Sequence, residues 1–298
     1  MTFATGSSVV ILPIDPSSDV VSDGNETVAL TLAAGTGYAV GISGAVTGII
    51  LDNDVAPGTV AKSIYDRTRH EVVNLYAFAA LKSDGSVVTW GYSFYGGDSS
   101  SVSSSLTSGV TQIFSNYYAF AALKSDGSVV TWGYSIYGGD SRLTSGVTQI
   151  FSNYYAFAAL KSDGSVVTWG YSNYGGDSSS VSSSLTSGVT QIFSKGSAFA
   201  ALKSDGSVVT WGNSTWGGDS SSVSSRLTSG VTQIFSNDVA FAALKSDGSV
   251  VTWGDSRWGG DSSSVSSRLT SGVTQIFSNA FAFAALKSDG SVVTWGDS

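Results

Sequence analysis

Aspartates and a single histidine are the side chains of this sequence that could carry out acid–base chemistry. The 298 residues contain 22 Asp and Glu, one His (His70) and no Cys. A Ser-His-Asp or Cys-His mechanism needs a general base beside its nucleophile. A zinc site built on His or Cys needs several such ligands. The composition therefore argues against both kinds of chemistry.

A pair of aspartates could still hydrolyse a glycosidic bond, but the aspartates recur in equivalent copies. Asp126 lies in a Lys-Ser-Asp-Gly phrase that occurs six times. Asp98 lies in a Gly-Gly-Asp phrase that occurs five times, where a metal or sugar site is conceivable. An active site normally needs one asymmetric constellation, and turn chemistry explains both sets as well. We therefore expect no enzymatic activity, and an aspartate-based carbohydrate-active enzyme is an alternative.

The elements that carry these aspartates belong to a tandem repeat. The phrase Ala-Leu-Lys-Ser-Asp-Gly-Ser-Val-Val-Thr-Trp-Gly occurs six times without change, with successive tryptophans 42, 37, 42, 42 and 42 residues apart. We expect these tryptophans to pack in the core. They are Trp90, Trp132, Trp169, Trp211, Trp253 and Trp295.

Each copy of the repeat has the residue pattern of β-strands. Residues 110–115, 119–124 and 128–132 are rich in β-branched, aromatic and other apolar residues. The Asp-Gly at 126–127 favours a tight hairpin turn. Apolar residues on both faces require neighbouring sheets on both sides. In the longer copies, residues such as 99–105 could add a short outer strand.

These patterns predict an all-β fold, a tandem-repeat β-propeller of about six three- or four-stranded blades. The ring is expected to be closed or nearly closed, and a partial β-sandwich precedes it. A β-solenoid is the structural alternative. The formal net charge of −8 argues against nucleic acid as a partner. No apolar stretch approaches the roughly 18 residues of a membrane span, and no signal peptide is visible at the start.

The first 54 residues differ from the repeats. Residues 26–32 read Glu-Thr-Val-Ala-Leu-Thr-Leu, and residues 45–54 read Ala-Val-Thr-Gly-Ile-Ile-Leu-Asp-Asn-Asp. This segment resembles the second half of a Calx-beta domain, a β-sandwich of extracellular and adhesion-type proteins. The resemblance implies an extracellular or cell-surface location and makes Glu26, Asp52 and Asp54 weak calcium candidates, although a solvated acidic loop is favoured. No other cofactor is expected.

Residues 55–63 are expected to form a linker, and residues 64–298 the propeller. The repeated Leu-Lys-x-Asp-Gly-x-Val-x-x-Trp-Gly resembles the regulator-of-chromosome-condensation repeat, and more closely the short repeats of the beta-lactamase inhibitor protein II type. Both families are typically seven-bladed propellers, whereas this chain has six hairpins. A closed six-blade ring, an open arc, and a ring completed by residues 60–76 all remain open. The family's Gly-Gln-Leu-Gly ending is replaced here by Gly96-Gly97-Asp98.

The repeats differ from one another mainly in two windows. The first precedes Ala-Phe-Ala-Ala-Leu, and the second follows Trp-Gly. In a hairpin both windows lie opposite the Ser-Asp-Gly turn, so they should share one face of the propeller. The candidate partner-binding residues there are Tyr76, Tyr92, Phe94, Tyr95, Tyr117, Tyr118, Tyr134, Tyr137, Tyr154, Tyr155, Tyr171, Tyr174, Asn213, Trp216, Asp238, Asp255, Arg257, Trp258 and Phe281.

Tyrosine and tryptophan interleaved with small polar residues are typical of recognition surfaces. Neutral drift of loops is the competing interpretation. The sequence therefore predicts a non-catalytic scaffold that binds a protein or a glycan through this face. The alternatives are an enzyme inhibitor of the beta-lactamase-inhibitor type, the carbohydrate-active enzyme above, or a recently duplicated fragment without a selected activity. The oligomeric state stays open.

Overall fold

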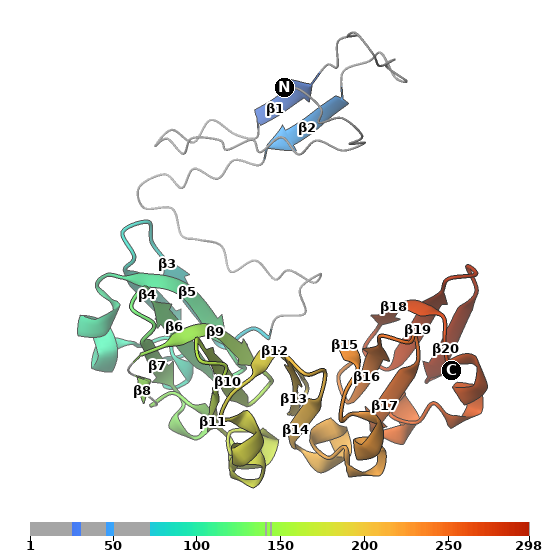
Figure 1. Ribbon diagram of the computed structural model, residues 1–298. Helices are drawn as coiled ribbons and strands as arrows, with labels where there is room; N and C mark the ends of the chain where they lie inside the picture. The colour runs from blue at the N-terminus through green and yellow to red at the C-terminus, as the bar shows by residue number, and fades with distance from the viewer. Residues whose placement is uncertain (1–25, 31–45, 51–71, 141, 144, 298) are drawn as a thin grey trace. The chain divides into compact units, whose positions relative to one another are not determined.

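The computed structural model describes residues 26–30, 46–50, 72–140, 142–143 and 145–297 (Figure 1). The chain divides into two compact units, residues 1–61 and 62–298. In the first unit, β1 (Glu26–Leu30) pairs antiparallel with β2 (Val46–Ile50). Glu26 begins β1, whereas Asp52 and Asp54 lie outside the described residues. The Calx-beta sandwich and its calcium site therefore stay predictions.

The second unit repeats one three-stranded antiparallel sheet. The second copy contains β5 (Val110–Ser115), β6 (Ala119–Lys124) and β7 (Val129–Gly133). The first copy has two strands among the described residues, β3 (Ala77–Leu81) and β4 (Val87–Gly91). The later copies are β9 (Val147–Ser152), β10 (Ala156–Lys161) and β11 (Val166–Gly170); β12 (Val189–Lys195), β13 (Ala198–Lys203) and β14 (Val208–Gly212); β15 (Val231–Ser236), β16 (Ala240–Lys245) and β17 (Val250–Gly254); and β18 (Val273–Ser278), β19 (Ala282–Lys287) and β20 (Val292–Gly296).

The Ser-Asp-Gly turn sets the register of each hairpin, as predicted. The Lys124 N–H donates to the Ser128 carbonyl at 2.9 Å. Gly127 has a φ of 76°, at which a residue with a side chain would be strained. The Asp126 carboxylate accepts a hydrogen bond from the Ser128 N–H. Ala119 consequently pairs with Gly133 across the hairpin.

The prediction of a short outer strand in the longer copies is wrong. Residues Ser100–Leu106 form a 3-10 helix, η2, rather than a strand. Serines favour such local structure because their hydroxyls bond nearby backbone, as Ser103 Oγ does to the Ser100 carbonyl. The five-residue-shorter copy has no room for that helix, and there the backbone forms the two-residue strand β8 (Arg142–Leu143) beside β7.

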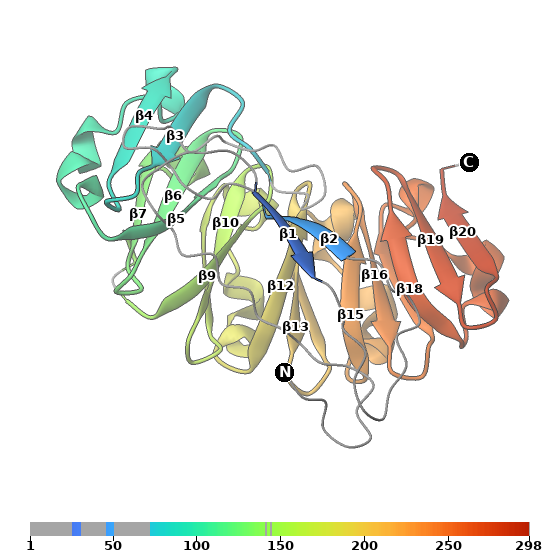
Figure 2. The ribbon, with the colours of Figure 1, turned by 90° about the horizontal axis from the view of Figure 1, so that it is seen from above.

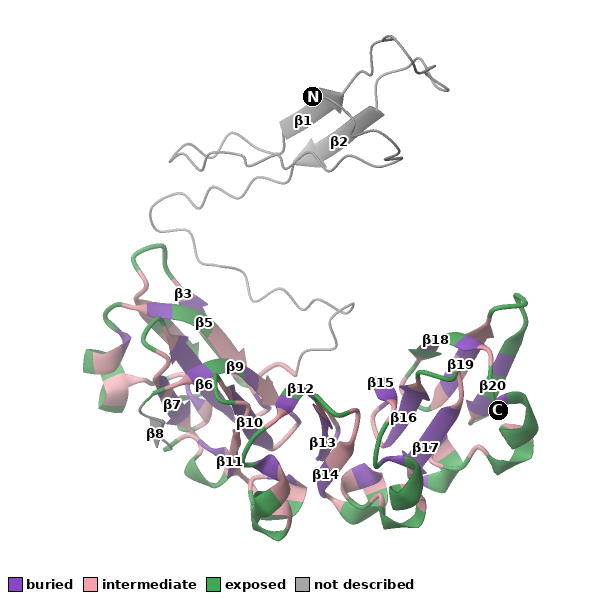
Figure 3. Ribbon diagram, in the orientation of Figure 1, coloured by how far each residue is buried: buried purple, intermediate pink, exposed green. Residues whose placement is uncertain are grey.

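The core consists of a series of apolar layers between neighbouring sheets. Ala119, Ala121 and Leu123 on one face of β6 pack against Phe157 and Trp169 of the next sheet. The other face of β6 packs against the first sheet, so a middle strand is buried on both sides (Figure 3). Five of the six repeated tryptophans are buried as expected, but Trp90 in the first copy is exposed. It is exposed because no described residue packs a preceding sheet against it.

The sheets of the second unit stand side by side in chain order (Figure 2). Antiparallel hairpins arranged in this way give a propeller-like fold, whereas solenoid coils would pair from one copy to the next. Sheet β3–β4 and sheet β18–β20 lie at the two ends of this row (Figures 1 and 2). A closed ring therefore stays a prediction. Among the described residues, no helix is long and apolar enough to cross a membrane.

Candidate functional site

Hairpin register brings the two variable windows together in every copy. Because Gly133 pairs with Ala119, the residues just beyond them, Tyr134 and Tyr118, are also adjacent. The Tyr134 N–H donates to the Tyr118 carbonyl at 3.0 Å. The other copies make the same bond between Tyr92 and Tyr76, Tyr171 and Tyr155, Asn213 and Ser197, Asp255 and Val239, and Asp297 and Phe281.

Glycines hold the second window against the next sheet. Tyr134 leads into a short 3-10 helix, η3 (Ser135–Tyr137), which Gly138 ends with a φ of 99°. A Cβ on Gly138 would lie 2.6 Å from Trp169 Cδ1 in the next sheet. The repeated Gly-Gly pair is therefore needed for this close approach, and the loop is fixed in position.

Six tyrosines form a continuous row across the first three copies, here called the tyrosine row. Neighbouring ring centroids along the row are 4.5 to 5.8 Å apart, within the range of attractive aromatic pairs. The row alternates between the first and second windows, and its members in order are Tyr76, Tyr95, Tyr118, Tyr137, Tyr155 and Tyr174.

Other predicted residues border this row. The Phe94 ring lies 4.5 Å from Tyr134, and Tyr92 lies 5.1 Å from Tyr95. Both Tyr92 and Phe94 are exposed. Tyr171 contacts Tyr137 at 5.6 Å. The structure thus shows an exposed aromatic cluster made from both windows.

The hydroxyls of three tyrosines in the middle of the row stay protonated. Burial raises the pKa of Tyr118, Tyr137 and Tyr155, and neighbouring tyrosines raise it further. A phenolate would be poorly solvated there and would face other phenolic oxygens. The row therefore offers neutral hydroxyl groups and ring faces to a ligand.

Tyr117 and Tyr154 form a second aromatic pair beside the row. Their rings stack at 4.5 Å with 13° between planes, and the Tyr117 N–H donates to the Tyr154 carbonyl at 3.2 Å. Burial raises the pKa of Tyr154 strongly, and the nearby carboxylate of Asp238 raises it further. The Tyr154 side chain is also hydrogen-bonded to Asp238, which connects the tyrosine-rich copies to the charged ones.

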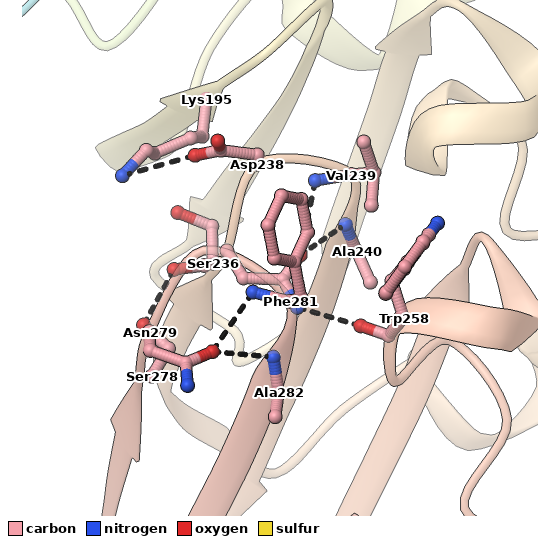
Figure 4. Close-up of polar contacts among 11 residues, drawn as sticks. Lys195, Ser236, Asp238, Val239, Ala240, Trp258, Ser278, Asn279, Phe281 and Ala282 are labelled. Atoms are coloured by element: carbon pink, nitrogen blue, oxygen red, sulfur yellow. Dashed lines mark hydrogen bonds and ion pairs between the residues drawn. The ribbon is translucent and has the colours of Figure 1, made fainter. Parts of the chain in front are cut away.

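Asp238 forms an ion pair that the sequence reasoning missed (Figure 4). Lys195 Nζ lies 3.3 Å from Asp238 Oδ1, and both side chains are partly buried. Lys195 interrupts a position that is asparagine in the five other copies. That interruption is the signal that could have identified it.

The repeated asparagine is a second residue that the sequence reasoning missed. Asn116 is fully buried, and its Oδ1 accepts from the N–H groups of Tyr118 and Ala119. Its Nδ2 donates to the Tyr137 carbonyl at 2.7 Å, so one side chain fixes both windows. Its constancy beside a variable window was the available signal. The equivalent residues are Asn74, Asn153, Asn237 and Asn279.

The fourth to sixth copies place charged and indole side chains in the same windows. Asp255 is buried, and it accepts two hydrogen bonds from the exposed Arg257 guanidinium, at 3.1 and 2.7 Å. These bonds hold the pKa of Asp255 below its usual value. Trp258 lies 4.8 Å from Phe281 of the following copy.

Trp216 lies apart from these aromatic pairs. Its backbone N–H donates to Asn213 Oδ1 at 3.2 Å. Its ring lies near Gly196, where an added Cβ would be 3.6 Å from Trp216 Cε3. The two windows of the fourth copy therefore also meet in this half of the face.

The repeated aspartates serve their own turns. The Asp126 carboxylate accepts from Ser128 Oγ at 2.6 Å, and the Asp98 carboxylate accepts from the Ser100 N–H at 2.8 Å. No three His, Asp or Glu side chains in the described part of the chain come together as a metal site. Turn chemistry accounts for both aspartate series.

A family model of the regulator of chromosome condensation (RCC1) repeat matches residues 147–175. This segment runs from the first residue of β9 to Gly175, which is one copy of the sheet with its variable loop. The fold is RCC1-repeat-like. Combined with the row of antiparallel sheets, the match describes an RCC1-like, propeller-like array.

Three solved structures that are similar to this chain share at most 19% sequence identity with it. Prp20p from Saccharomyces cerevisiae is 16% identical, with 76% of this chain and 70% of that chain covered and a TM-score of 0.45. Human WBSCR16 is 19% identical, with 63% of this chain covered and a TM-score of 0.41. This chain spans 61% of the length of that human protein.

The CRINKLY WD40 ectodomain of the Arabidopsis thaliana receptor kinase ACR4 is 16% identical, with 75% of this chain and 77% of that chain covered and a TM-score of 0.41. No curated protein sequence matches the chain.

Proposed function

We propose that this RCC1-like array is a non-catalytic binding scaffold that recognises a protein or a glycan through its variable face. One observation carries the proposal. The copies are nearly identical, and the residues in which they chiefly differ are brought together by hydrogen bonds such as Tyr134 N–H to the Tyr118 carbonyl.

The chemistry of the face suits recognition. Neutral tyrosine hydroxyls donate and accept hydrogen bonds, and their rings give contact area at a low cost in side-chain entropy. Exposed rings such as Tyr92 and Phe94 can stack on a sugar ring or an apolar side chain. Arg257, anchored by buried Asp255, adds a positive group at the other end of the face. Inhibition of an enzyme would be one case of such binding.

Carbohydrate hydrolysis is the less favoured proposal. The two repeated series of aspartates lie in turns, where their carboxylates bond the next serine. A general acid in a glycosidase needs a raised pKa, whereas serine hydrogen bonds lower the pKa of Asp126.

The experiment selects ligands for the full chain from a glycan array and from a phage-displayed random peptide library. The test variant is Tyr92→Ser with Phe94→Ser, both on the face, and the matched control is Ser83→Ala with Ser125→Ala at the opposite turns. Removing exposed aromatic contacts worth about 2 kcal/mol should weaken binding roughly thirtyfold, with the melting temperature unchanged. Equal weakening in the turn variant, or no ligand in either screen, would refute the proposal.

A further inference from the structure

Each junction between neighbouring copies joins two different faces. The face turned toward the following copy carries Ala119, Ala121, Leu123 and Val129 in the second copy and is here called the trailing face. The face turned toward the preceding copy carries the stacked Phe157 and Trp169 in the third copy and is here called the leading face. The same kinds of residue form all five junctions of the array.

The first copy exposes its leading face. Phe78 and Trp90 stack at 5.4 Å like their equivalents, but they are 51% and 41% exposed. The equivalent Phe157 and Trp169 are 0% and 6% exposed. Val88, on the same face, is also exposed. Among the described residues, this aromatic pair therefore lacks the trailing face against which the others pack.

The last copy exposes its trailing face. Val292 is 52% exposed, whereas its equivalent Val129 is 3% exposed. Phe277 is also exposed. The Ser-Asp-Gly turn of the last copy is uncovered as well. A Cβ on Gly290 would meet nothing within 4 Å, whereas one on the equivalent Gly127 would meet Gly146 N of the next copy at 2.9 Å.

We propose that a second copy of this chain docks head to tail on these ends, the leading face of one chain packing on the trailing face of another. The two exposed faces are the complementary halves of a junction that the chain already makes five times. Exposed apolar patches on soluble proteins mark interaction surfaces. Because the two halves differ, the contact is heterologous, and it extends until the assembly closes as a ring or continues as a filament.

The geometry favours a second chain over closure within one chain. Both views place β3–β4 and β18–β20 at opposite ends of the row (Figures 1 and 2). Bringing them together would require changes at the packed junctions between them, and close-packed interiors resist such changes. A docked second copy leaves all five junctions unchanged.

Sedimentation velocity over a range of protein concentrations tests the association. The variants are Val88→Asp at the leading end and Val292→Asp at the trailing end, and the control is Ile136→Asp at an equally exposed position in the short helix η3. The unmodified chain and the control should increase in mass with concentration, and each end variant should stay monomeric. An equimolar mixture of the two end variants should give a dimer containing one of each, because each retains one intact face.

A monomeric unmodified chain at all concentrations, an end variant that associates alone, or a mixture that stays monomeric would overturn the proposal. Near-ultraviolet circular dichroism of each variant checks that its packing is intact.

Because the sequence contains no cysteine, a pair of introduced cysteines provides a second test. The pair Val88→Cys and Val292→Cys in one chain should form disulfides between chains, since the equivalent valines Val293 and Val250 pack in one cluster at the last internal junction. A disulfide within a monomeric chain would show ring closure and overturn the proposal, as would the absence of any disulfide in the associated species.

Discussion

Lys195 Nζ lies 3.3 Å from Asp238 Oδ1, and each residue occurs in only one copy of the repeat. Lys195 replaces the asparagine that fixes the windows elsewhere, and Asp238 stands where the second and third copies carry Tyr117 and Tyr154. Gly196 follows Lys195 in the chain, and a Cβ there would overlap the Asp238 carbonyl. Three divergent residues are therefore fitted to one another across a junction.

The ion pair should show energetic coupling. A double-mutant cycle of Lys195→Ala and Asp238→Ala, followed by urea denaturation, should give a coupling of up to about 1 kcal/mol, because both groups retain contact with solvent. The coupling should shrink at 1 M salt, where charges are screened within about 3 Å. Additive single effects would show that the pair contributes nothing.

Replacing the buried Asn116 should lower the free energy of unfolding more than replacing its exposed equivalent, Asn279. Asn116→Ala leaves the Tyr118 and Ala119 N–H groups and the Tyr137 carbonyl without their side-chain partner. We expect a loss of about 2 kcal/mol in the free energy of unfolding. Asn279→Ala, in the last copy, is the matched control and should lose less, because water reaches that residue. Equal losses would contradict the assignment.

The loss of stability on replacing a repeated tryptophan should depend on the copy in which it lies. Trp132 Nε1 donates to the Gly96 carbonyl of the preceding copy at 3.0 Å, and the ring is buried. Trp132→Phe should therefore cost about 1 to 3 kcal/mol through the lost bond and the gap left behind. Trp90→Phe, measured at low protein concentration, should change stability by less than about 0.5 kcal/mol. The reverse order would contradict the described packing.

Acid should lower the stability of the array because it protonates the aspartates of the turns. Hydrogen bonds from Ser128 lower the pKa of Asp126 from its ordinary value of 3.8, and five other turn aspartates share this pattern. A carboxylate with a lowered folded-state pKa contributes stability that is complete above the unfolded value. That stability is lost as the pH falls through the folded pKa.

Urea midpoints measured between about pH 5 and pH 2 should therefore fall with pH. The slope should be smaller in Asp126→Asn, which keeps an acceptor for the Ser128 N–H but does not titrate. An unchanged slope in this variant would contradict the role assigned to the turn.

The strands and the shared location of the windows could be predicted from sequence because both follow from local rules. Asp-Gly at 126–127 sets the hairpin turn, and a two-residue period then places Tyr118 beside Tyr134. The 3-10 helix η2 was missed because a Ser-rich run with one valine and one leucine suits either a strand or a helical turn. The side-chain bonds of Asp98, Ser103 and Thr107 to the backbone favour the helix.

Contacts between neighbouring copies could not be predicted from the sequence. The exposure of Trp90 depends on what packs beside the first sheet, and an identical twelve-residue phrase carries no information on that. The Lys195–Asp238 pair joins residues 43 positions apart on adjacent sheets. A short sequence pattern does not describe such a pair.

An alanine scan of both windows and of the six turns, read as affinity for the ligand selected on the glycan array or peptide library, determines whether the variable face is the binding surface. The losses should fall on window residues of neighbouring copies, such as Tyr92 and Phe94, with the turn positions neutral. Losses centred on the Ser-Asp-Gly turns, or spread evenly over both ends of the sheets, would contradict this assignment.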